Sequence, residues 1–298
     1  MQVEKLIRIL PREIFNQIEM DKLELLQEIR LRVNRQSIFR YRDEEKIINY
    51  IPGEKDMISI LQMLCENSIY SYQNQISNGF VTLYGGHRVG IMGSCSIKDG
   101  KINNINYISS LNFRITKEII GSCNGILKYV ITNNEINNTL IISKPGCGKT
   151  TVLRDLIRVI SNIGFNVSLI DERGEIAAMY KGVPQNDIGL RTDVMDNVTK
   201  SLGMKIAVRT MAPDVIFADE IGREEDIEAI NYGVCSGVKG IFTAHAASLE
   251  ELIKNETLKK LYDEKVFNKL IFLEKEGKVK NVYTLDHNLY KLEDEIIS

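Results

Sequence analysis

The sequence predicts an α/β protein with two domains, a smaller α+β domain over residues 1–121 and a parallel-sheet domain over residues 122–298. After residue 121, short apolar segments alternate with helical patterns, as in TLIIS, NVSLID, DVIFAD and GIFTAH. Such alternation is typical of a parallel sheet with helices on both faces. Before residue 121, glycine-rich turns separate β-branched segments, which favours a small antiparallel sheet.

The first domain is expected to combine a helix with strands. Residues 23–51 change from a helical opening to strand-like alternation. Residues 56–79 follow with apolar residues near helical spacing. Residues 79–118 carry β-branched residues with glycine and Asp-Gly turn signals, so they predict the strands that complete the sheet.

The composition disfavours several classes of protein. The 298 residues include 38 Lys and Arg against 40 Asp and Glu, a formal net charge of -2, so no global positive field attracts nucleic acid or anionic lipid. The first 20 residues contain acidic side chains and no long apolar run, which argues against a signal peptide or an anchor. No apolar stretch approaches the ~20 residues of a membrane span. We therefore expect a cytoplasmic protein that reaches a membrane only through a partner protein.

The five cysteines are scattered, odd in number, and lack a CxxC pair or a nearby histidine. This spacing predicts reduced thiols in a cytosolic protein, buried as small apolar side chains. Cys147 is the exception, because the loop that contains it sets its position.

The stretch TLIISKPGCGKTTVLRD, residues 139–155, joins an apolar strand to a helix through a glycine-containing loop. Strand, loop and helix N-terminus together direct backbone N–H groups and the positive end of a helix dipole at a phosphate. We expect Lys149 to reach the β- and γ-phosphates of a nucleotide and Thr150 to bind Mg²⁺. Ser143 stands where the usual pattern has its first glycine, a position that requires a small residue. The expected nucleotide contacts are Ser143, Lys144, Pro145, Gly146, Cys147, Gly148, Lys149, Thr150 and Thr151.

The stretch DVIFADE, residues 214–220, supplies a second part of such a site. Its apolar residues predict a buried parallel strand that ends at Asp219 and Glu220. Asp219 is expected to hold Mg²⁺ through the water shell of the ion, and Glu220 to orient or deprotonate the attacking water. Parallel sheets bind ligands at the carboxyl ends of their strands, which is where this acidic pair falls.

Two further strand ends carry polar side chains. VSLIDERGEIA ends its strand at Asp171, Glu172 and Arg173, and GIFTAHAAS ends its strand at Thr243 and His245. A histidine in this place can contact the γ-phosphate and report its loss to the next helix. It can equally be an imidazole that is hydrogen-bonded at a strand end.

The chain resembles the secretion-type ATPases of type II and type IV secretion and pilus systems. The resemblance lies in SKPGCGKTT, IDERGEIA, VRTMAPDVIFADEIG and TAHA, which follow the order of the Walker A, Asp-box, Walker B and His-box motifs. Within that superfamily the chain is most similar to the stage III AA sporulation family of endospore-forming bacteria. That similarity extends through the first domain, in EIRLRVNRQ, GGHRVGIMGSC and SSLNFRI, and through KPGCGKTTVLRDLIR, DERGEIAA and GLRTDVMD.

The resemblance implies a RecA-like P-loop ATPase core behind the smaller domain, assembled as a homo-oligomeric, hexameric ring on the mother-cell side of a membrane. It implies that ATP, with Mg²⁺, is hydrolysed to ADP and phosphate during spore formation. Hydrolysis would drive the assembly or operation of a channel complex between mother cell and forespore. The implied partner is an integral membrane platform protein, and no direct contact with nucleic acid is expected.

The resemblance also implies roles for charged residues. Arg88 and Arg114 would approach the phosphates, where an arginine neutralises transition-state charge and contributes ~10³-fold or more to the rate. Glu172 corresponds to the Asp-box acid, which polarises the water or positions Mg²⁺. Arg191 and Arg209 correspond to flanking positions that act across a subunit boundary. The alternative for each is an ordinary exposed charge.

Other functions stay open. A RecA-like nucleic-acid motor is disfavoured by the near-neutral charge and by the lack of a basic stripe interleaved with aromatic residues. A scaffold that binds ATP and rarely hydrolyses it would tolerate the loss of Glu220. An ABC transporter subunit is disfavoured because no LSGGQ-like signature lies between the two Walker motifs.

No base-reading motif such as NKxD is present, so the choice of ATP over GTP rests on the resemblance. The Walker B motif has Asp219-Glu220 where many secretion ATPases have Gly-Glu. The aspartate favours the assignment of Asp219 to magnesium.

Overall fold

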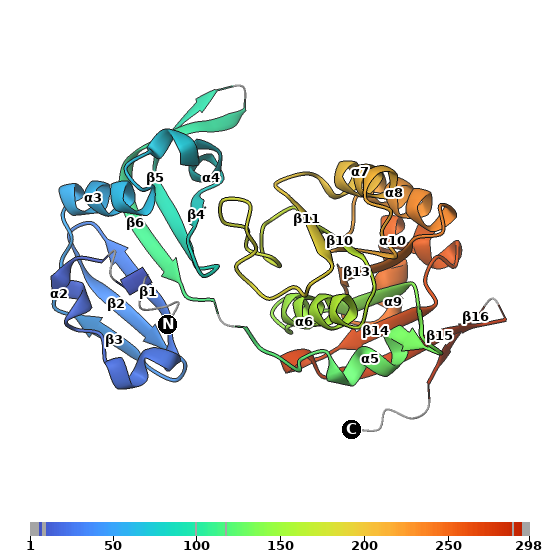
Figure 1. Ribbon diagram of the computed structural model, residues 1–298. Helices are drawn as coiled ribbons and strands as arrows, with labels where there is room; N and C mark the ends of the chain where they lie inside the picture. Colours follow the sequence, from blue (N-terminus) through green and yellow to red (C-terminus); the bar gives the residue numbers. More distant parts are fainter. Residues whose placement is uncertain (1–5, 8–9, 99, 117, 288, 294–298) are drawn as a thin grey trace. The chain divides into compact units, whose positions relative to one another are not determined.

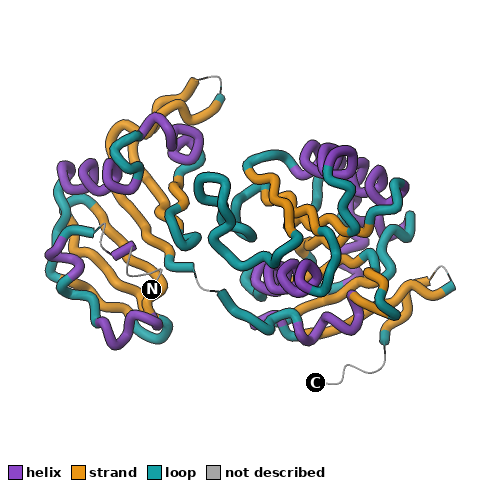
Figure 2. Tube along the Cα trace, viewed as in Figure 1, coloured by secondary structure: helices purple, strands orange, loops and turns teal. Residues whose placement is uncertain are grey.

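A computed structural model describes residues 6–7, 10–98, 100–116, 118–287 and 289–293 of the chain, which folds into two compact units (Figures 1 and 2). The first unit comprises Met1–Lys117 with Ala178–Asn186, and the second comprises Glu118–Ala177 with Asp187–Ser298. The chain therefore passes between the units three times. Within the described ranges, every helix is too short or too polar to cross a membrane.

The first unit is built on an antiparallel sheet of six strands in the order β3-β2-β1-β6-β5-β4. Burial alternates along β1, where Ile29 and Leu31 are fully buried and the residues beside them are partly exposed, which confirms the predicted strand. The strands are β1 (Leu26–Arg32), β2 (Arg35–Tyr41), β3 (Glu45–Ile48), β4 (Phe80–Thr82), β5 (Arg88–Lys98) and β6 (Lys101–Arg114).

Helices α3 and α4 pack against β6 and complete the core of the first unit. The predicted helix corresponds to α3, whose inward side buries Met57, Ile60 and Leu64. Phe39 and Phe113 are fully buried at the centre of the core. The helical segments are α2 (Arg12–Phe15), η1 (Met20–Leu25), α3 (Glu54–Leu64), η2 (Ile69–Tyr72) and α4 (Gln73–Ser77).

The segment Ala178–Asn186 belongs to the first unit, although it follows β10 of the second unit in sequence. The ammonium of Lys181 lies 2.6 Å from the carboxylate of Glu66. The backbone N–H of Gly85 donates to the side-chain oxygen of Gln185 at 2.9 Å. This segment carries no apolar periodicity, so the sequence alone did not predict its place.

The second unit contains a sheet of eight strands in the order β11-β10-β12-β13-β9-β14-β15-β16. The strands from β11 to β14 in this order are parallel to their neighbours, which confirms the parallel sheet predicted from the segments that form β9, β10, β12 and β13. The parallel strands β11 and β14 and the antiparallel strands β15 and β16 add to this prediction. A separate pair is formed by β7 (Ile131–Thr132) and β8 (Glu135–Ile136). The sheet strands are β9 (Thr139–Ser143), β10 (Val167–Asp171), β11 (Thr192–Asp196), β12 (Val215–Ala218), β13 (Lys239–His245), β14 (Lys269–Leu273), β15 (Val279–Asp286) and β16 (Leu289–Leu292).

Helices cover both faces of this sheet (Figure 1). Helices α7 and α8 lie side by side on one face, where Leu140 and Ile142 of β9 join their apolar cluster. Ile141 lies between them in sequence and points to the opposite face, where it is also fully buried. Burial on both faces explains the continuous apolar runs of these strands. The helical segments are α5 (Asn124–Val130), α6 (Lys149–Asn162), α7 (Lys200–Thr210), α8 (Glu224–Cys235), α9 (Leu249–Lys254), α10 (Glu256–Asp263) and η3 (Lys275–Gly277).

Asp155 on α6 fixes the start of α5. Its carboxylate accepts hydrogen bonds from the backbone N–H of Cys123 at 3.0 Å and from the guanidinium of Arg158 at 2.7 Å. Burial alone would raise the pKa of Asp155, but these hydrogen bonds outweigh it, so the pKa lies below its ordinary value. The ionised carboxylate is therefore the form that the fold stabilises.

We expect Asp155→Asn to lower the free energy of unfolding by about 1–3 kcal/mol at pH 7, because the buried N–H of Cys123 and the partly buried guanidinium of Arg158 lose a charged acceptor. The depressed folded-state pKa means that the carboxylate contributes fully above its unfolded pKa of about 3.9. The contribution disappears as pH falls through the folded-state pKa. Urea unfolding between pH 7 and pH 3 should show the wild type and the variant converging in acid. Glu224→Gln, at an exposed ion pair with Lys260, is the control. A difference that does not change with pH would contradict this account.

The cysteines follow the prediction only in part. Cys65 and Cys123 are buried free thiols, and burial raises their pKa to about 11 and about 12. Cys95 and Cys235 are exposed, so the prediction of burial is wrong for these two. Cys95 lies in β5 beyond the residues that pair with β4, and Cys235 is the last residue of α8, so neither position is covered by a second layer.

Candidate active site

The loop between β9 and α6 has the predicted strand-loop-helix form. Gly146 and Gly148 have φ values of 77° and 94°, in the left-handed region that favours glycine. A Cβ atom at Gly148 would lie 3.2 Å from the backbone nitrogen of Gly277. That same N–H of Gly277 donates to the carbonyl of Cys147 at 2.8 Å. The turn before β15 therefore supports the loop, a contact that the sequence did not indicate.

Lys149 is the first residue of α6 and its side chain is buried against the neighbouring strand ends. Its ammonium lies 2.9 Å from Nδ1 of His245, 3.2 Å from the carbonyl oxygen of Ser143 and 3.3 Å from the Ser143 hydroxyl. Burial lowers the pKa of Lys149, although the carboxylates of Asp219 and Glu220 oppose this effect. Lys149 therefore rests on the strand end, in a position from which a phosphate could withdraw it.

Ser143, the departure from the usual loop pattern, is buried at the end of β9. Its hydroxyl donates to the carbonyl of Lys144 at 2.8 Å and also contacts the Lys149 ammonium. A small residue fits this position, as the sequence indicated. The serine adds a polar contact to Lys149 that a glycine cannot make.

Asp219 lies just after β12 and is held by two hydroxyl groups. The Thr150 hydroxyl donates to its carboxylate at 3.0 Å, and the Thr243 hydroxyl donates to the other oxygen. Burial raises the pKa of Asp219, while these two hydrogen bonds oppose the rise. The hydroxyl of Thr150 and the carboxylate of Asp219 are hard oxygen donors side by side, a set that fits Mg²⁺. In the described part of the chain, no cluster of three or more His, Cys, Asp or Glu side chains could hold a metal, so a magnesium ion here would also need water or phosphate oxygens.

Glu220 has a φ of 53°, which is uncommon for a residue other than glycine. Two backbone hydrogen bonds to Thr243 hold this conformation, from the N–H of Glu220 to the Thr243 hydroxyl and from the N–H of Ile221 to the Thr243 carbonyl, both at 2.8 Å. Backbone strain of this kind is common at functional sites. In this conformation the side chain of Glu220 contacts His245 and Arg173.

Both carboxylate oxygens of Glu220 have partners. Oε1 lies 3.0 Å from Nε2 of His245, and Oε2 forms an ion pair with the guanidinium of Arg173. Burial would raise the pKa of Glu220, but the hydrogen bond with His245 and the charge of Arg173 bring it below its ordinary value. Glu220 is therefore ionised near neutral pH, as a base or a water-orienting group requires.

The predicted residues converge because β9, β12 and β13 are neighbours in the sheet. His245 lies directly opposite Ser143 in the register of β13 and β9. One chain of contacts runs from Lys149 through His245 to Glu220, and a second joins Thr150, Asp219 and Thr243. The carboxyl ends of three strands thus form one polar network.

Glu172 is engaged elsewhere. Its carboxylate forms ion pairs with Lys200, the buried first residue of α7, and with Arg223 at 3.2 Å. Burial would raise the pKa of Glu172, but these cations bring it below its ordinary value. The ion pairs join the end of β10 to the starts of α7 and α8.

The four predicted arginines lie on other elements. Arg88 begins β5 and Arg114 ends β6, directly opposite each other in the first unit. The guanidinium of Arg88 also lies 4.7 Å from the centre of the Phe80 ring. Arg191 is exposed before β11, and Arg209 is exposed in the last turn of α7. Their roles near a phosphate stay predictions.

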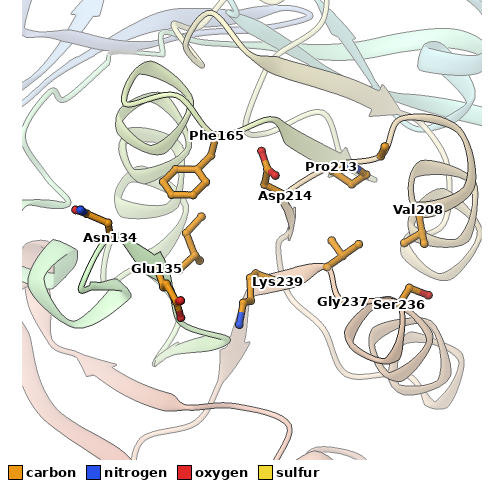
Figure 3. Close-up of a pocket in the computed structure, with 12 residues that line it drawn as sticks. Asn134, Glu135, Phe165, Val208, Pro213, Asp214, Ser236, Gly237 and Lys239 are labelled. Carbon is orange, nitrogen blue, oxygen red and sulfur yellow. The ribbon is translucent and has the colours of Figure 1, made fainter.

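A separate cavity of about 500 Å³ lies at the opposite edge of the sheet, where β12 and β13 begin (Figure 3). Asp214 and Lys239 line it together with apolar side chains that include Phe165 and Pro213. Because parallel sheets bind ligands at the carboxyl ends of their strands, this cavity is not the candidate nucleotide site.

Comparisons with known proteins agree with the motifs. The family described as "Sporulation stage III, protein AA" matches residues 1–289. The chain is 35% identical over 272 residues to the stage III sporulation protein AA of Bacillus subtilis (strain 168), covering 89% of this chain and 88% of that protein. It is also 34% identical over 163 residues to the uncharacterized protein ycf45 of Cyanidium caldarium, covering 53% of this chain and 47% of the relative.

Two solved structures share the fold. The ATPase DotB of Legionella pneumophila superposes with a TM-score of 0.58 at 13% identity, covering 88% of this chain and 78% of DotB. The pilus retraction motor PilT, solved with bound ADP, superposes with a TM-score of 0.58 at 14% identity, covering 91% of this chain and 79% of PilT. Identities this low show the fold alone, which is that of the P-loop secretion ATPases. With the family match over most of its length, the chain belongs to the sporulation stage III protein AA family.

Proposed function

We propose that this protein hydrolyses ATP in a Mg²⁺-dependent reaction and that hydrolysis drives the assembly or operation of a channel complex between mother cell and forespore. The observation that supports this most strongly is the convergence of Lys149, Asp219, Glu220 and His245 at three adjacent strand ends. A phosphate-binding loop alone would support only binding. A loop joined to an ionised, oriented carboxylate supports hydrolysis.

In the proposed reaction, Lys149 leaves Ser143 and His245 and contacts the β- and γ-phosphates. Thr150 and Asp219 would hold Mg²⁺, which neutralises charge on the phosphate oxygens when bound. Glu220 orients a water molecule and accepts its proton as the water oxygen attacks the γ-phosphorus. The bond to the bridging oxygen breaks, and ADP and phosphate are the products.

His245 would connect phosphate binding by Lys149 with the positioning of Glu220. Its Nδ1 contacts Lys149 and its Nε2 contacts Glu220, so withdrawal of Lys149 by a phosphate frees one side of the imidazole. A proton taken up at Nδ1 would let that side donate to a γ-phosphate oxygen, while Nε2–H keeps its hydrogen bond to Glu220. Both the binding group and the base would in this way respond to the same phosphate.

The protein would act as a homo-oligomer, a hexameric ring on the mother-cell side of the membrane, docked on an integral membrane platform protein. Arg88 and Arg114 would supply positive charge to the phosphates, and Arg191 and Arg209 would act across a subunit boundary. The family match and the fold shared with DotB and PilT support this proposal. DotB is described as an ATPase and PilT as a pilus retraction motor.

Phosphate release from Mg·ATP at several protein concentrations, with molecular mass measured in parallel, tests the function and the ring together. We expect activity per subunit to rise as the mass increases toward a hexamer. Hydrolysis that is independent of assembly would remove Arg191 and Arg209, the residues assigned across a subunit boundary, from the mechanism. Strong stimulation by single-stranded DNA, without a response to membranes or to a partner's cytosolic segment, would favour the nucleic-acid motor instead.

A further inference from the structure

We infer that Arg173 is a positioning residue, which holds the carboxylate of Glu220 in the orientation needed to activate water. This role rests on the proposed ATPase function and assigns a residue to that site. Arg173 enters the site through its ion pair with Glu220.

The loop that carries Arg173 is held rigidly from both sides. The carboxylate of Asp171 accepts the backbone N–H groups of Glu175, Ile176 and Ala177 at 2.9, 3.1 and 2.9 Å. From α6, the guanidinium of Arg154 donates to the carbonyls of Glu175 and Ile176 at 2.7 and 3.0 Å. Arg173 therefore lies in a turn that follows β10 and is hydrogen-bonded both to Asp171 at the end of that strand and to Arg154 of α6.

The turn itself separates two neighbouring side chains. Gly174 has a φ of 63°, and its N–H donates to the carbonyl of Asp171 at 3.1 Å. Glu172 is directed to Lys200 and Arg223, whereas Arg173 is directed to Glu220. The two neighbouring side chains thus have different ion-pair partners.

The contacts of the Glu220 carboxylate fix its orientation and still leave room for it to accept a hydrogen bond from water. His245 occupies Oε1 and Arg173 occupies Oε2, so the two contacts fix the rotation of the carboxylate. Each carboxylate oxygen has two lone-pair directions, and one on each oxygen remains for water. With the backbone held by Thr243, Glu220 is fixed at three points, and Arg173 supplies the third.

The ion pair is too exposed to serve stability. The side chain of Arg173 is 63% exposed and that of Glu220 is 26% exposed. Exposed ion pairs contribute little to the free energy of folding, about 0–1 kcal/mol. Misplacement of a catalytic group by about 1 Å, in contrast, can reduce a rate by about 10²-fold. We therefore expect loss of this ion pair to change the free energy of folding little and the rate of hydrolysis strongly.

The test compares Arg173→Ala and Arg173→Lys with the wild type in steady-state ATP hydrolysis. We expect Arg173→Ala to lower kcat by roughly 10- to 100-fold, with KM changed less than about threefold, because the base loses orientation while the phosphate contacts remain. Arg173→Lys retains the positive charge and should recover part of the loss. Lys260→Ala, which removes an exposed ion pair with Glu224, should leave kcat unchanged.

A double-mutant cycle with Glu220→Gln separates positioning from direct contact with phosphate. In single-turnover phosphate release, adding Arg173→Ala to Glu220→Gln should cause little further loss. Two full and additive losses, or a rise in KM that accounts for the whole effect, would overturn the proposal and indicate a phosphate contact. An unchanged kcat in Arg173→Ala would also overturn it.

The thermal shift of Arg173→Ala on binding Mg·ATP should match that of the wild type, which would exclude a folding defect in the variant. If the wild type itself does not hydrolyse ATP, the proposed function fails as well; if only Arg173→Ala is unaffected, the proposed function stands.

Discussion

Replacing Glu220 with glutamine is expected to reduce ATP turnover by about 10²- to 10³-fold while nucleotide binding stays intact. Glutamine keeps the length and shape of the side chain, and the backbone bonds to Thr243 do not depend on charge. The amide, however, cannot accept a proton from water and loses the ion pair with Arg173. Lys149, Thr150 and Asp219, which hold the phosphates and Mg²⁺ in the proposal, are untouched.

Phosphate release and binding of a fluorescent ATP analogue should be measured on the same preparations. Glu224→Gln, on the exposed start of α8, is a matched control and should behave as the wild type. Wild-type phosphate release in Glu220→Gln would remove Glu220 as the base. It would also leave the ATP-binding scaffold as the better description of the protein.

Replacing Lys149 with methionine is expected to stabilise the nucleotide-free protein and to weaken its response to nucleotide. Lys149 is 5% exposed, and the three hydrogen bonds of its ammonium are with Ser143 and His245 rather than with a carboxylate. A buried cation without a bonded anion is costly, so an apolar side chain of similar shape should raise the free energy of unfolding by about 1–2 kcal/mol. Hydrogen bonds to charged groups contribute about 1.5–3 kcal/mol, so loss of the phosphate contact should weaken ATP binding by roughly 10- to 100-fold.

Thermal unfolding with and without Mg·ATP measures both effects. The wild type should gain stability with nucleotide, by about 2.7 kcal/mol at 100 times its Kd. Lys149→Met should begin from a higher midpoint and gain only about 0.4–1.4 kcal/mol at the same ATP concentration. Lys205→Met, at a more exposed lysine of α7, controls for the general effect of the substitution. A destabilised Lys149→Met protein that responds to ATP as strongly as the wild type would show that Lys149 is a structural lysine.

The strands β9, β10, β12 and β13 of the second unit were predictable because nearly all of their residues are buried, whichever face of the sheet they lie on. Runs such as TLIIS and DVIFAD contain little besides apolar residues, and they end where the backbone leaves the sheet. Their order in the sheet does not follow from these runs. Nor do these runs indicate β15 and β16, which extend the sheet beyond β14 in antiparallel pairing.

The types of residue at the site were predictable, but the contacts between them were not. Lys149, Asp219 and Glu220 follow from the motifs. That His245 touches both Lys149 and Glu220 depends on the register of β13 with β9, which places His245 opposite Ser143. Register across a parallel pair is a tertiary property that no single segment encodes.

Arg173 shows why part of the site was missed. The sequence places it at a strand end, yet exposed charges after a strand are common, and spacing cannot select its partner. The selection comes from the turn that Asp171 and Arg154 hold, formed by residues on two different elements. The segment Ala178–Asn186 was missed for a similar reason, since its partner Glu66 is more than 100 residues away in sequence.

Conversion of radiolabelled ATP in a single turnover, with the purified full-length chain in excess over nucleotide, tests the central claim most directly. The experiment reports the chemical step at Lys149, Asp219 and Glu220 without a partner protein. With Mg²⁺ present, bound ATP should be converted to ADP and phosphate, and chelation of the metal should stop the conversion. Recovery of protein-bound ATP unchanged in the presence of Mg²⁺ would contradict the account.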